Sequence, residues 1–211
     1  MRIKNTKLII FDVDGVLIDS KKNMRLSFNK MIKKNKMNLK FENYFNQIGL
    51  PFSSIMKNLG IKKNLDNLKR DYFKSSLFFK KKIKPYSGVY KTLIHLKENF
   101  KLAIVTSKSN RNTRNFLSYF FPKIKFELIY SPNQKMRPKP YPDMLVNACK
   151  ILKVKTSNAI YVGDTFHDYK ASKGAKVKFI LASYGYLLGN KKKIKTNYKI
   201  KKFSDIIGVL K

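Results

Sequence analysis

The acidic residues of this chain are few, so their placement is informative. Only 12 of the 211 residues are Asp or Glu, yet five of them fall in two short segments: Asp12, Asp14 and Asp19 in the first, Asp164 and Asp168 in the second. Carboxylates that are brought together repel one another, and a hard divalent cation with oxygen ligands neutralises them. Mg²⁺ is therefore the expected cofactor. The spacing does not match an EF-hand calcium loop, and the Walker A, GxGxxG and HExxH motifs are absent from the sequence.

Groups that could hold phosphate oxygens occur at two further places. Thr106 and Ser107 follow the apolar run LAIV, so a hydroxyl and backbone N–H groups would lie at a strand-to-helix turn. Lys139 lies between two prolines, which stiffen the backbone and would hold its ammonium at a fixed point. Each of these residues is common in purely structural roles. Together with the carboxylates they predict a site for a phosphate group.

The elements that must position these residues are alternating strands and helices. Apolar runs separated by segments of helical period indicate a parallel sheet that is covered on both faces. Asp12 and Asp164 would each end a strand, at the sheet edge where ligands bind in such folds. We therefore expect an α/β fold with a Rossmann-like, doubly wound parallel sheet. The predicted strands are 7–11, 102–106, 126–130, 159–162 and 177–182.

One interval breaks the alternation of strands and helices. Between the first two strands the sequence has no strand-like run, but it has helical stripes at 24–37, 51–59 and 65–79. An all-helical insert of this size predicts a separate subdomain, which ends at the turn cluster PYSG. We expect an α/β core at 1–19 and 84–211 and a helical cap at 20–83.

In these features the chain resembles the haloacid dehalogenase superfamily. Four motifs of that superfamily occur in order: LIIFDVDGV, LAIVTSK, RPKPYPD and YVGDTFHD. They span almost the whole chain, and FDVDGVLIDS is the most specific of the matching segments. The helical insert is similar to the cap that the family carries after its first motif. The segments PYSGVYKTLIHLK and VGDTFHDYKASKGA are similar to the phosphoglycolate phosphatase and β-phosphoglucomutase branch.

The resemblance implies a mechanism for the first group of carboxylates. Asp12 would attack phosphorus and form an aspartyl-phosphate, and Asp14 would protonate the leaving alcohol and then take a proton from water. Mg²⁺ would be held by the Asp12 carboxylate, the Asp14 backbone carbonyl and Asp164. Because dehalogenases and P-type ATPases lack an acid at the position of Asp14, a phosphatase or a phosphomutase is implied.

The resemblance also implies roles for the residues around the phosphate. Thr106, the Ser107 amide and Lys139 would stabilise the phosphoryl oxygens, and Asp168 would orient Lys139 or a metal-bound water. The expected function is Mg²⁺-dependent hydrolysis of a small phosphorylated metabolite, of the phosphoglycolate or sugar phosphate type. A β-phosphoglucomutase-like phosphomutase is the alternative.

The cap would decide the substrate. Asp19 and Ser20 could either cap its first helix or act in the site. Four other residues could face the site, although packing or surface roles are more common for such positions: Asn23, Arg25, Gly49 and Lys57.

The charge of the chain is extreme, at +35, and it rests on 41 Lys and only 6 Arg. Lysines occur in every segment, and Asn, Ile, Phe and Tyr are also frequent, which is typical of an A- and T-rich coding sequence. A nucleic-acid-binding protein or nucleic-acid phosphatase is the less favoured alternative, because such proteins gather charge on one face and favour Arg. The single Cys149 excludes an internal disulfide. We expect a cytoplasmic enzyme with a small phosphorylated substrate, no specific nucleic acid and no membrane partner.

Overall fold

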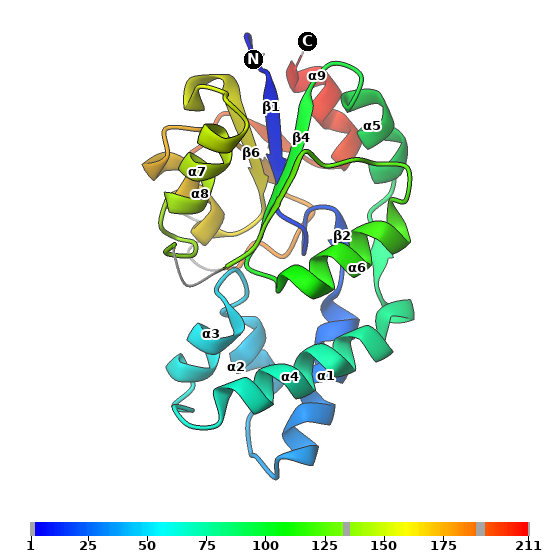
Figure 1. Ribbon diagram of the computed structural model, residues 1–211, viewed down its shortest axis with the longest axis vertical. Coiled ribbons are helices and arrows are strands. Elements are labelled where there is room, and N and C mark those ends of the chain that lie inside the picture. Colours follow the sequence, from blue (N-terminus) through cyan, green and yellow to red (C-terminus); the bar gives the residue numbers. More distant parts are fainter. Residues whose placement is uncertain (1–2, 133–135, 189–192, 211) are drawn as a thin grey trace.

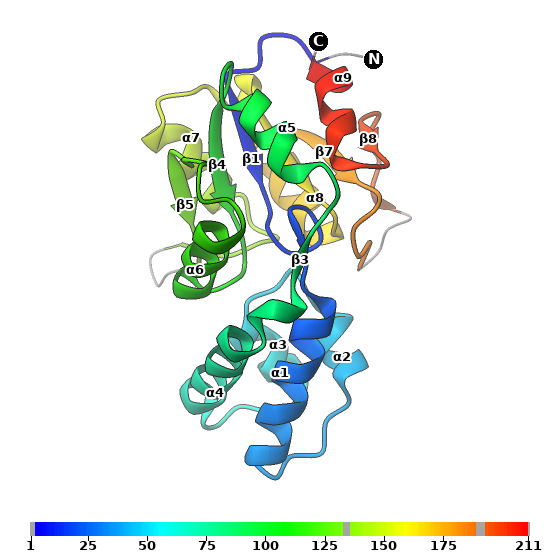
Figure 2. The ribbon, with the colours of Figure 1, turned by 90° about the vertical axis from the view of Figure 1, so that its right-hand side faces the viewer.

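The computed structural model describes residues 3–132, 136–188 and 193–210. Figures 1 and 2 show two parts, an α/β core in the upper half and a helical cap in the lower half. The chain leaves and re-enters the core through β2 (Ile18–Asp19) and β3 (Lys84–Pro85), which form a short antiparallel pair at the junction.

The core is built on a six-stranded sheet whose paired strands all run parallel. The strands are β1 (Leu8–Phe11), β4 (Lys101–Val105), β5 (Leu128–Tyr130), β6 (Ala159–Gly163), β7 (Lys178–Ala182) and β8 (Lys199–Ile200). Their order is β5-β4-β1-β6-β7-β8, so β1 lies in the middle, where the winding of the chain reverses direction. The predicted α/β fold with a doubly wound parallel sheet is confirmed.

Helices cover both faces of this sheet (Figure 1). The helices on one face are α5 (Val89–Leu96), α6 (Asn110–Phe120) and α9 (Ile206–Leu210). Those on the other face are α7 (Asp143–Ile151) and α8 (Phe166–Gly174). Because strand side chains alternate, Ile9 and Phe11 of β1 enter the first core and Leu8 and Ile10 enter the second. Both faces are therefore apolar, and the strand ends are left for polar side chains.

The cap consists of α1 (Lys21–Lys34), α2 (Phe41–Phe45), α3 (Phe52–Asn58) and α4 (Leu65–Phe78). The three stripes seen in the sequence correspond to α1, α3 and α4. Aromatic rings fill the space between these helices, with Tyr44 in contact with Phe28, Phe52 and Tyr72. The cap thus has a hydrophobic core of its own.

The sequence did not predict the short strands β2 and β3, nor α2 and β8. The five residues of α2 are too few to show a helical period. The two residues of β8 lie in the lysine-rich stretch 191–202, whose first two residues lie outside the described part. Lys199 is exposed and only Ile200 is buried, so the strand has no apolar run. Among the described residues, short turns of 3₁₀ helix include Lys80–Lys82, Thr156–Asn158 and Phe203–Asp205.

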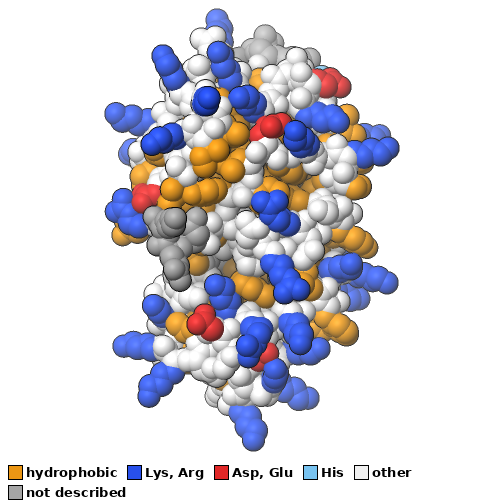
Figure 3. Space-filling view, viewed as in Figure 1, with side chains coloured by type: hydrophobic (Ala, Val, Ile, Leu, Met, Phe, Trp, Pro, Cys, Tyr) orange, Lys and Arg blue, Asp and Glu red, His pale blue; other side chains and the backbone are white. Residues whose placement is uncertain are grey.

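The surface is rich in cations. On the face shown in Figure 3, Lys and Arg side chains occur over both the core and the cap, with few acidic side chains between them. In the part of the chain that the structure describes, no helix is both long and apolar enough to cross a membrane.

Candidate active site

Three adjacent strands end at the same place in the core. Asp12 follows β1, and its amide donates a hydrogen bond of 2.9 Å to the carbonyl of Val162 in β6. Thr106 follows β4, and Asp164 follows β6. The carboxyl ends of parallel strands meet at one edge of the sheet, and the chain reverses its winding at β1, so these side chains converge. The structure therefore brings the predicted Asp12, Thr106 and Asp164 together.

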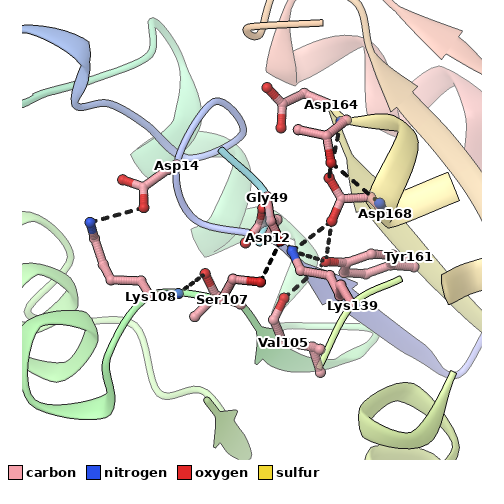
Figure 4. A network of polar contacts seen from close by, with 12 residues as sticks. Asp12, Asp14, Gly49, Val105, Ser107, Lys108, Lys139, Tyr161, Asp164 and Asp168 are labelled. Atoms are coloured by element: carbon pink, nitrogen blue, oxygen red, sulfur yellow. Dashed lines mark hydrogen bonds and ion pairs between the residues drawn. The ribbon is translucent and has the colours of Figure 1, made fainter. Parts of the chain in front are cut away.

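Lys139 lies beneath this edge, fully buried between two carboxylates (Figure 4). Its Nζ is 2.6 Å from Asp168 Oδ1 and 3.0 Å from Asp12 Oδ2, and it donates a 3.1 Å hydrogen bond to the Tyr161 hydroxyl. The Tyr161 hydroxyl is also within hydrogen-bond distance of Asp168 Oδ1, at 2.9 Å, and donates to the carbonyl of Val105. Tyr161 was not predicted, because within AIYV its ring reads as one more apolar strand residue.

The charges of this buried cluster depend on one another. Burial works against the charge of Lys139, but the carboxylates of Asp12 and Asp168 outweigh it and raise the pKa of the ammonium. Burial works against the charge of Asp168 too, yet Lys139 and two hydrogen bonds from Thr165 hold the pKa of that carboxyl below its usual value. Lys139 and Asp168 are therefore charged at neutral pH.

Asp12 and Asp164 differ from Asp168. Burial raises the pKa of Asp12 to about 6, with Lys139 offsetting part of the effect. Burial, with the nearby charges of Asp168 and Asp12, raises the pKa of Asp164 well above its usual value. Among the described residues, neither Asp12 Oδ1 nor Asp164 Oδ1 has a hydrogen-bond partner, although both atoms are buried.

This donor set fits a divalent cation. Oxygen atoms of Asp12, Asp164 and Asp168 lie within 4.8 Å of one another. Both oxygens of Asp168 are already engaged, Oδ1 by Lys139 and Oδ2 by the Thr165 hydroxyl at 2.6 Å. Within the described part of the chain, Asp12 Oδ1 and Asp164 Oδ1 are the oxygens of this cluster left without a partner, and a cation would lower the cost of their buried negative charge.

Asp14 faces a small cavity above Asp12. Its Oδ2 is 2.9 Å from Lys108 Nζ (Figure 4), and its Oδ1 accepts a hydrogen bond from the Ser20 hydroxyl. Ser20 precedes α1 but makes no side-chain cap bond to it. The role of the Lys108 side chain was not predicted from the sequence; the only signal is its place directly after Thr106 and Ser107.

The cavity has a volume of about 50 Å³ and lies between the core and the cap. Ser107 joins the two parts, because its hydroxyl donates a 2.6 Å hydrogen bond to the carbonyl of Gly49 in the cap. The lining residues include Asp12, Asp14, Thr106, Ser107 and Lys108 from the core and Met24, Tyr44, Gly49, Phe52 and Tyr72 from the cap. Most of the cap wall is therefore apolar or aromatic.

Of the four cap residues singled out in the sequence, Gly49 lines the cavity. Asn23 is buried in the cap and donates a 2.8 Å hydrogen bond to the carbonyl of Ser76. Arg25 pairs with Glu42 on the surface, and Lys57 is exposed. Packing and surface positions thus account for the last three.

Comparisons with known proteins agree with the motifs. Residues 9–182 match the family described as haloacid dehalogenase-like hydrolase. A phosphoglycolate phosphatase of Aquifex aeolicus (strain VF5) is 29% identical over 191 residues, which cover 86% of each chain. Pyrophosphatase PpaX of Halalkalibacterium halodurans is 30% identical over 188 residues, which cover 83% of each chain.

The fold has close counterparts among solved structures. The crystal structure of CbbY from Rhodobacter sphaeroides, in complex with phosphate, matches with a TM-score of 0.85 at 19% identity, over 97% of this chain and 99% of that chain. The family match covers most of the sequence and includes the segments that carry Asp12, Thr106, Lys139 and Asp164. The chain is an enzyme that belongs to the haloacid dehalogenase-like hydrolase family.

Proposed function

We propose that this enzyme hydrolyses a small phosphate monoester through an aspartyl-phosphate on Asp12, with Mg²⁺ as cofactor. The observation that carries the proposal is the state of the Asp12 carboxylate. It is buried, Lys139 holds one of its oxygens at 3.0 Å, and the other has no partner among the described residues. A fixed carboxylate with a free oxygen at the floor of a cavity is suited to nucleophilic attack. The phosphatase names of the relatives support this reading.

In the first step, an oxygen of Asp12 forms a bond to phosphorus and the bond from phosphorus to the leaving oxygen breaks. Asp14 lines the same cavity and gives a proton to the leaving oxygen. Lys139 balances the charge of Asp12 and the incoming phosphoryl oxygens, and the Thr106 hydroxyl and Ser107 amide hold those oxygens.

In the second step, water attacks phosphorus and the bond to Asp12 breaks. Asp14 takes the proton of this water, so it is ready for the next substrate. Asp168 acts through Lys139, which it holds at 2.6 Å. The carboxylates of Asp12 and Asp164 and the backbone carbonyl of Asp14 would hold Mg²⁺, which would supply positive charge to offset the repulsion between nucleophile and phosphate.

The cavity also supports a class of substrate. The side chains that the cap contributes to it are mostly apolar or aromatic. Lys108 is the one cation among the described residues that line it, and its side chain is only 9% exposed. Lys108 pairs with Asp14 in this structure, and when Asp14 carries the proton for the leaving oxygen the ammonium becomes available to a second anionic group of the substrate. We therefore propose a small ester of the phosphoglycolate type as the preferred substrate.

A phosphate-release assay over a panel of phosphorylated metabolites, with Mg²⁺ and with EDTA, tests the proposal. Asp12→Asn should lower turnover about 10³-fold or more, because the nucleophile is lost. Asp66→Asn, which removes an exposed acid of α4, is the matched control and should leave turnover unchanged. Acid quenching followed by mass spectrometry should find phosphate on the Asp12 peptide. Turnover by Asp12→Asn, or activity in EDTA, would contradict the mechanism.

A further inference from the structure

One phenol joins the candidate catalytic groups to the cap. Tyr186 lies in the loop after β7, and its hydroxyl accepts a 2.8 Å hydrogen bond from the amide of Ser20. The same hydroxyl is 3.3 Å from Ser20 Oγ and 3.3 Å from Asp19 Oδ1, and its single proton can go to either oxygen. Ser20 Oγ in turn donates to Asp14 Oδ1. Tyr186 is therefore linked to the proposed acid and base through a single side chain.

The backbone of the loop also reaches the proposed metal site. The amide of Tyr186 donates a 2.7 Å hydrogen bond to Asp164 Oδ2. This approach requires Gly185, because a Cβ at that position would overlap the carbonyl of Gly15 and crowd Asp164. The path of the loop is thus set by close contact with the candidate site and not by its own secondary structure.

The ring of Tyr186 belongs to the cap. It packs edge-on against Phe45, with 5.2 Å between the ring centroids. Tyr186 and Leu188 both contact the buried core of the cap helices. Ser20 is the last residue before α1, so the hydrogen bond from its amide holds the start of the first cap helix against this loop. A shift of the cap would therefore move Tyr186 and Ser20 together.

We propose that Tyr186 is a positioning residue that fixes the direction of the Asp14 carboxylate through Ser20 and makes that direction depend on the seating of the cap. Because the Ser20 hydroxyl gives its hydrogen to Asp14, its oxygen is free to accept the Tyr186 proton, while the Ser20 amide donates to the Tyr186 oxygen. The inference rests on the proposed function, because it assigns the consequence to proton transfer by Asp14.

Tyr186→Phe tests this with the folded enzyme. The variant keeps the ring packed against Phe45 and the hydrogen bond from the backbone amide to Asp164, and it loses only the hydroxyl. We expect kcat/KM for an alkyl phosphate to fall about 10- to 100-fold, as misplacing a general acid does. For p-nitrophenyl phosphate, whose leaving group needs no proton, kcat/KM should stay within about twofold. A purely structural effect would lower both values alike.

Tyr184→Phe is the matched control, because it removes a phenol from the same loop whose hydroxyl donates to the carbonyl of Val16 at 2.8 Å. It should leave the ratio of the two kcat/KM values unchanged. An unchanged ratio in Tyr186→Phe would overturn the inference while the phosphatase proposal stands.

A crystal structure of Tyr186→Phe provides a readout that does not depend on activity. The Ser20 and Asp14 side chains should turn away from each other. If both side chains keep their places, the inference is wrong. This readout holds even if the enzyme hydrolyses neither substrate, an outcome that would refute the proposed function separately.

Discussion

Replacing Lys139 by Met should destabilise the fold in a way that depends on pH. The ammonium is fully buried, with Asp168 Oδ1 at 2.6 Å and Asp12 Oδ2 at 3.0 Å. Met fills similar space without the charge, so two buried carboxylates lose their counter-ion. Removing one partner of a buried pair costs about 3–5 kcal/mol. For a protein of this size each kcal/mol lowers the Tm by about 2–4 °C, which gives roughly 6–20 °C.

The pH dependence follows from Asp12, whose pKa is raised to about 6 in the folded wild type. Above that pH the wild type has released the proton, and so has the unfolded chain. Without Lys139 the pKa of Asp12 in the folded state rises further. The folded variant then keeps a proton on Asp12 that its unfolded state does not hold. Its free energy of unfolding then falls by about 1.4 kcal/mol per pH unit. The deficit relative to wild type should grow by about 2 kcal/mol between pH 6 and pH 7.5.

Urea unfolding in EDTA at pH 6 and pH 7.5 measures both quantities, because EDTA removes divalent cations that would mask the carboxylates. Lys91→Met, at an exposed position of α5, is the control and should leave the free energy of unfolding unchanged. A deficit for Lys139→Met below about 1 kcal/mol at pH 7.5, where about 3–5 kcal/mol is expected, would refute the reasoning. So would a deficit that does not change with pH.

The remaining predictions concern the metal, the substrate and the glycine that packs against the Asp164 carboxylate. Mg²⁺ should raise the Tm at pH 7.5 and much less at pH 5, because the raised pKa values of Asp12 and Asp164 let protons compete with the cation below about pH 6; equal shifts in differential scanning fluorimetry would contradict this. Lys108→Met should raise KM about 10- to 100-fold for a phosphate ester that carries a carboxylate, but not for one with a neutral tail, since a charge-assisted hydrogen bond is lost. Similar KM changes for both esters in steady-state kinetics would argue against a second-anion site. Gly15→Ala should abolish the Mg²⁺-dependent rise in Tm, because the new Cβ would overlap the Asp164 carboxylate at a residue with a φ of +81°, whereas Gly208→Ala, with open space around it, should not; a normal Mg²⁺ response in Gly15→Ala would show that the loop can move aside.

Much of the core could be predicted from the sequence because its signals are local. Each buried strand of a parallel sheet is a short apolar run, and such runs mark β1, β4, β5, β6 and β7 to within two residues at either end. The family motifs in order then led to the correct superfamily. The elements that escaped prediction include the short ones α2, β2, β3 and β8, whose stability comes from neighbours and not from their own pattern.

The sequence by itself also determined which carboxylates meet. A residue that follows a parallel strand lies at the carboxyl edge of the sheet, so the positions of Asp12 and Asp164 follow from the strands that precede them. Lys139 was identified in another way, from the two prolines that flank it and from the family motif. Nothing in the local sequence says which acids a buried lysine will face.

Only the tertiary structure decided which side chains pair with these residues. Lys108 reaches Asp14, the Tyr161 hydroxyl meets Lys139, and Tyr186 meets Ser20 across 166 positions of the chain. Each of these contacts depends on the path of a loop and on how the cap sits on the core. A hydrogen bond requires its two atoms to be placed within a few tenths of an ångström. Residue type and spacing determine which sheet edge a side chain occupies, but the packing of the whole molecule sets distances of that precision.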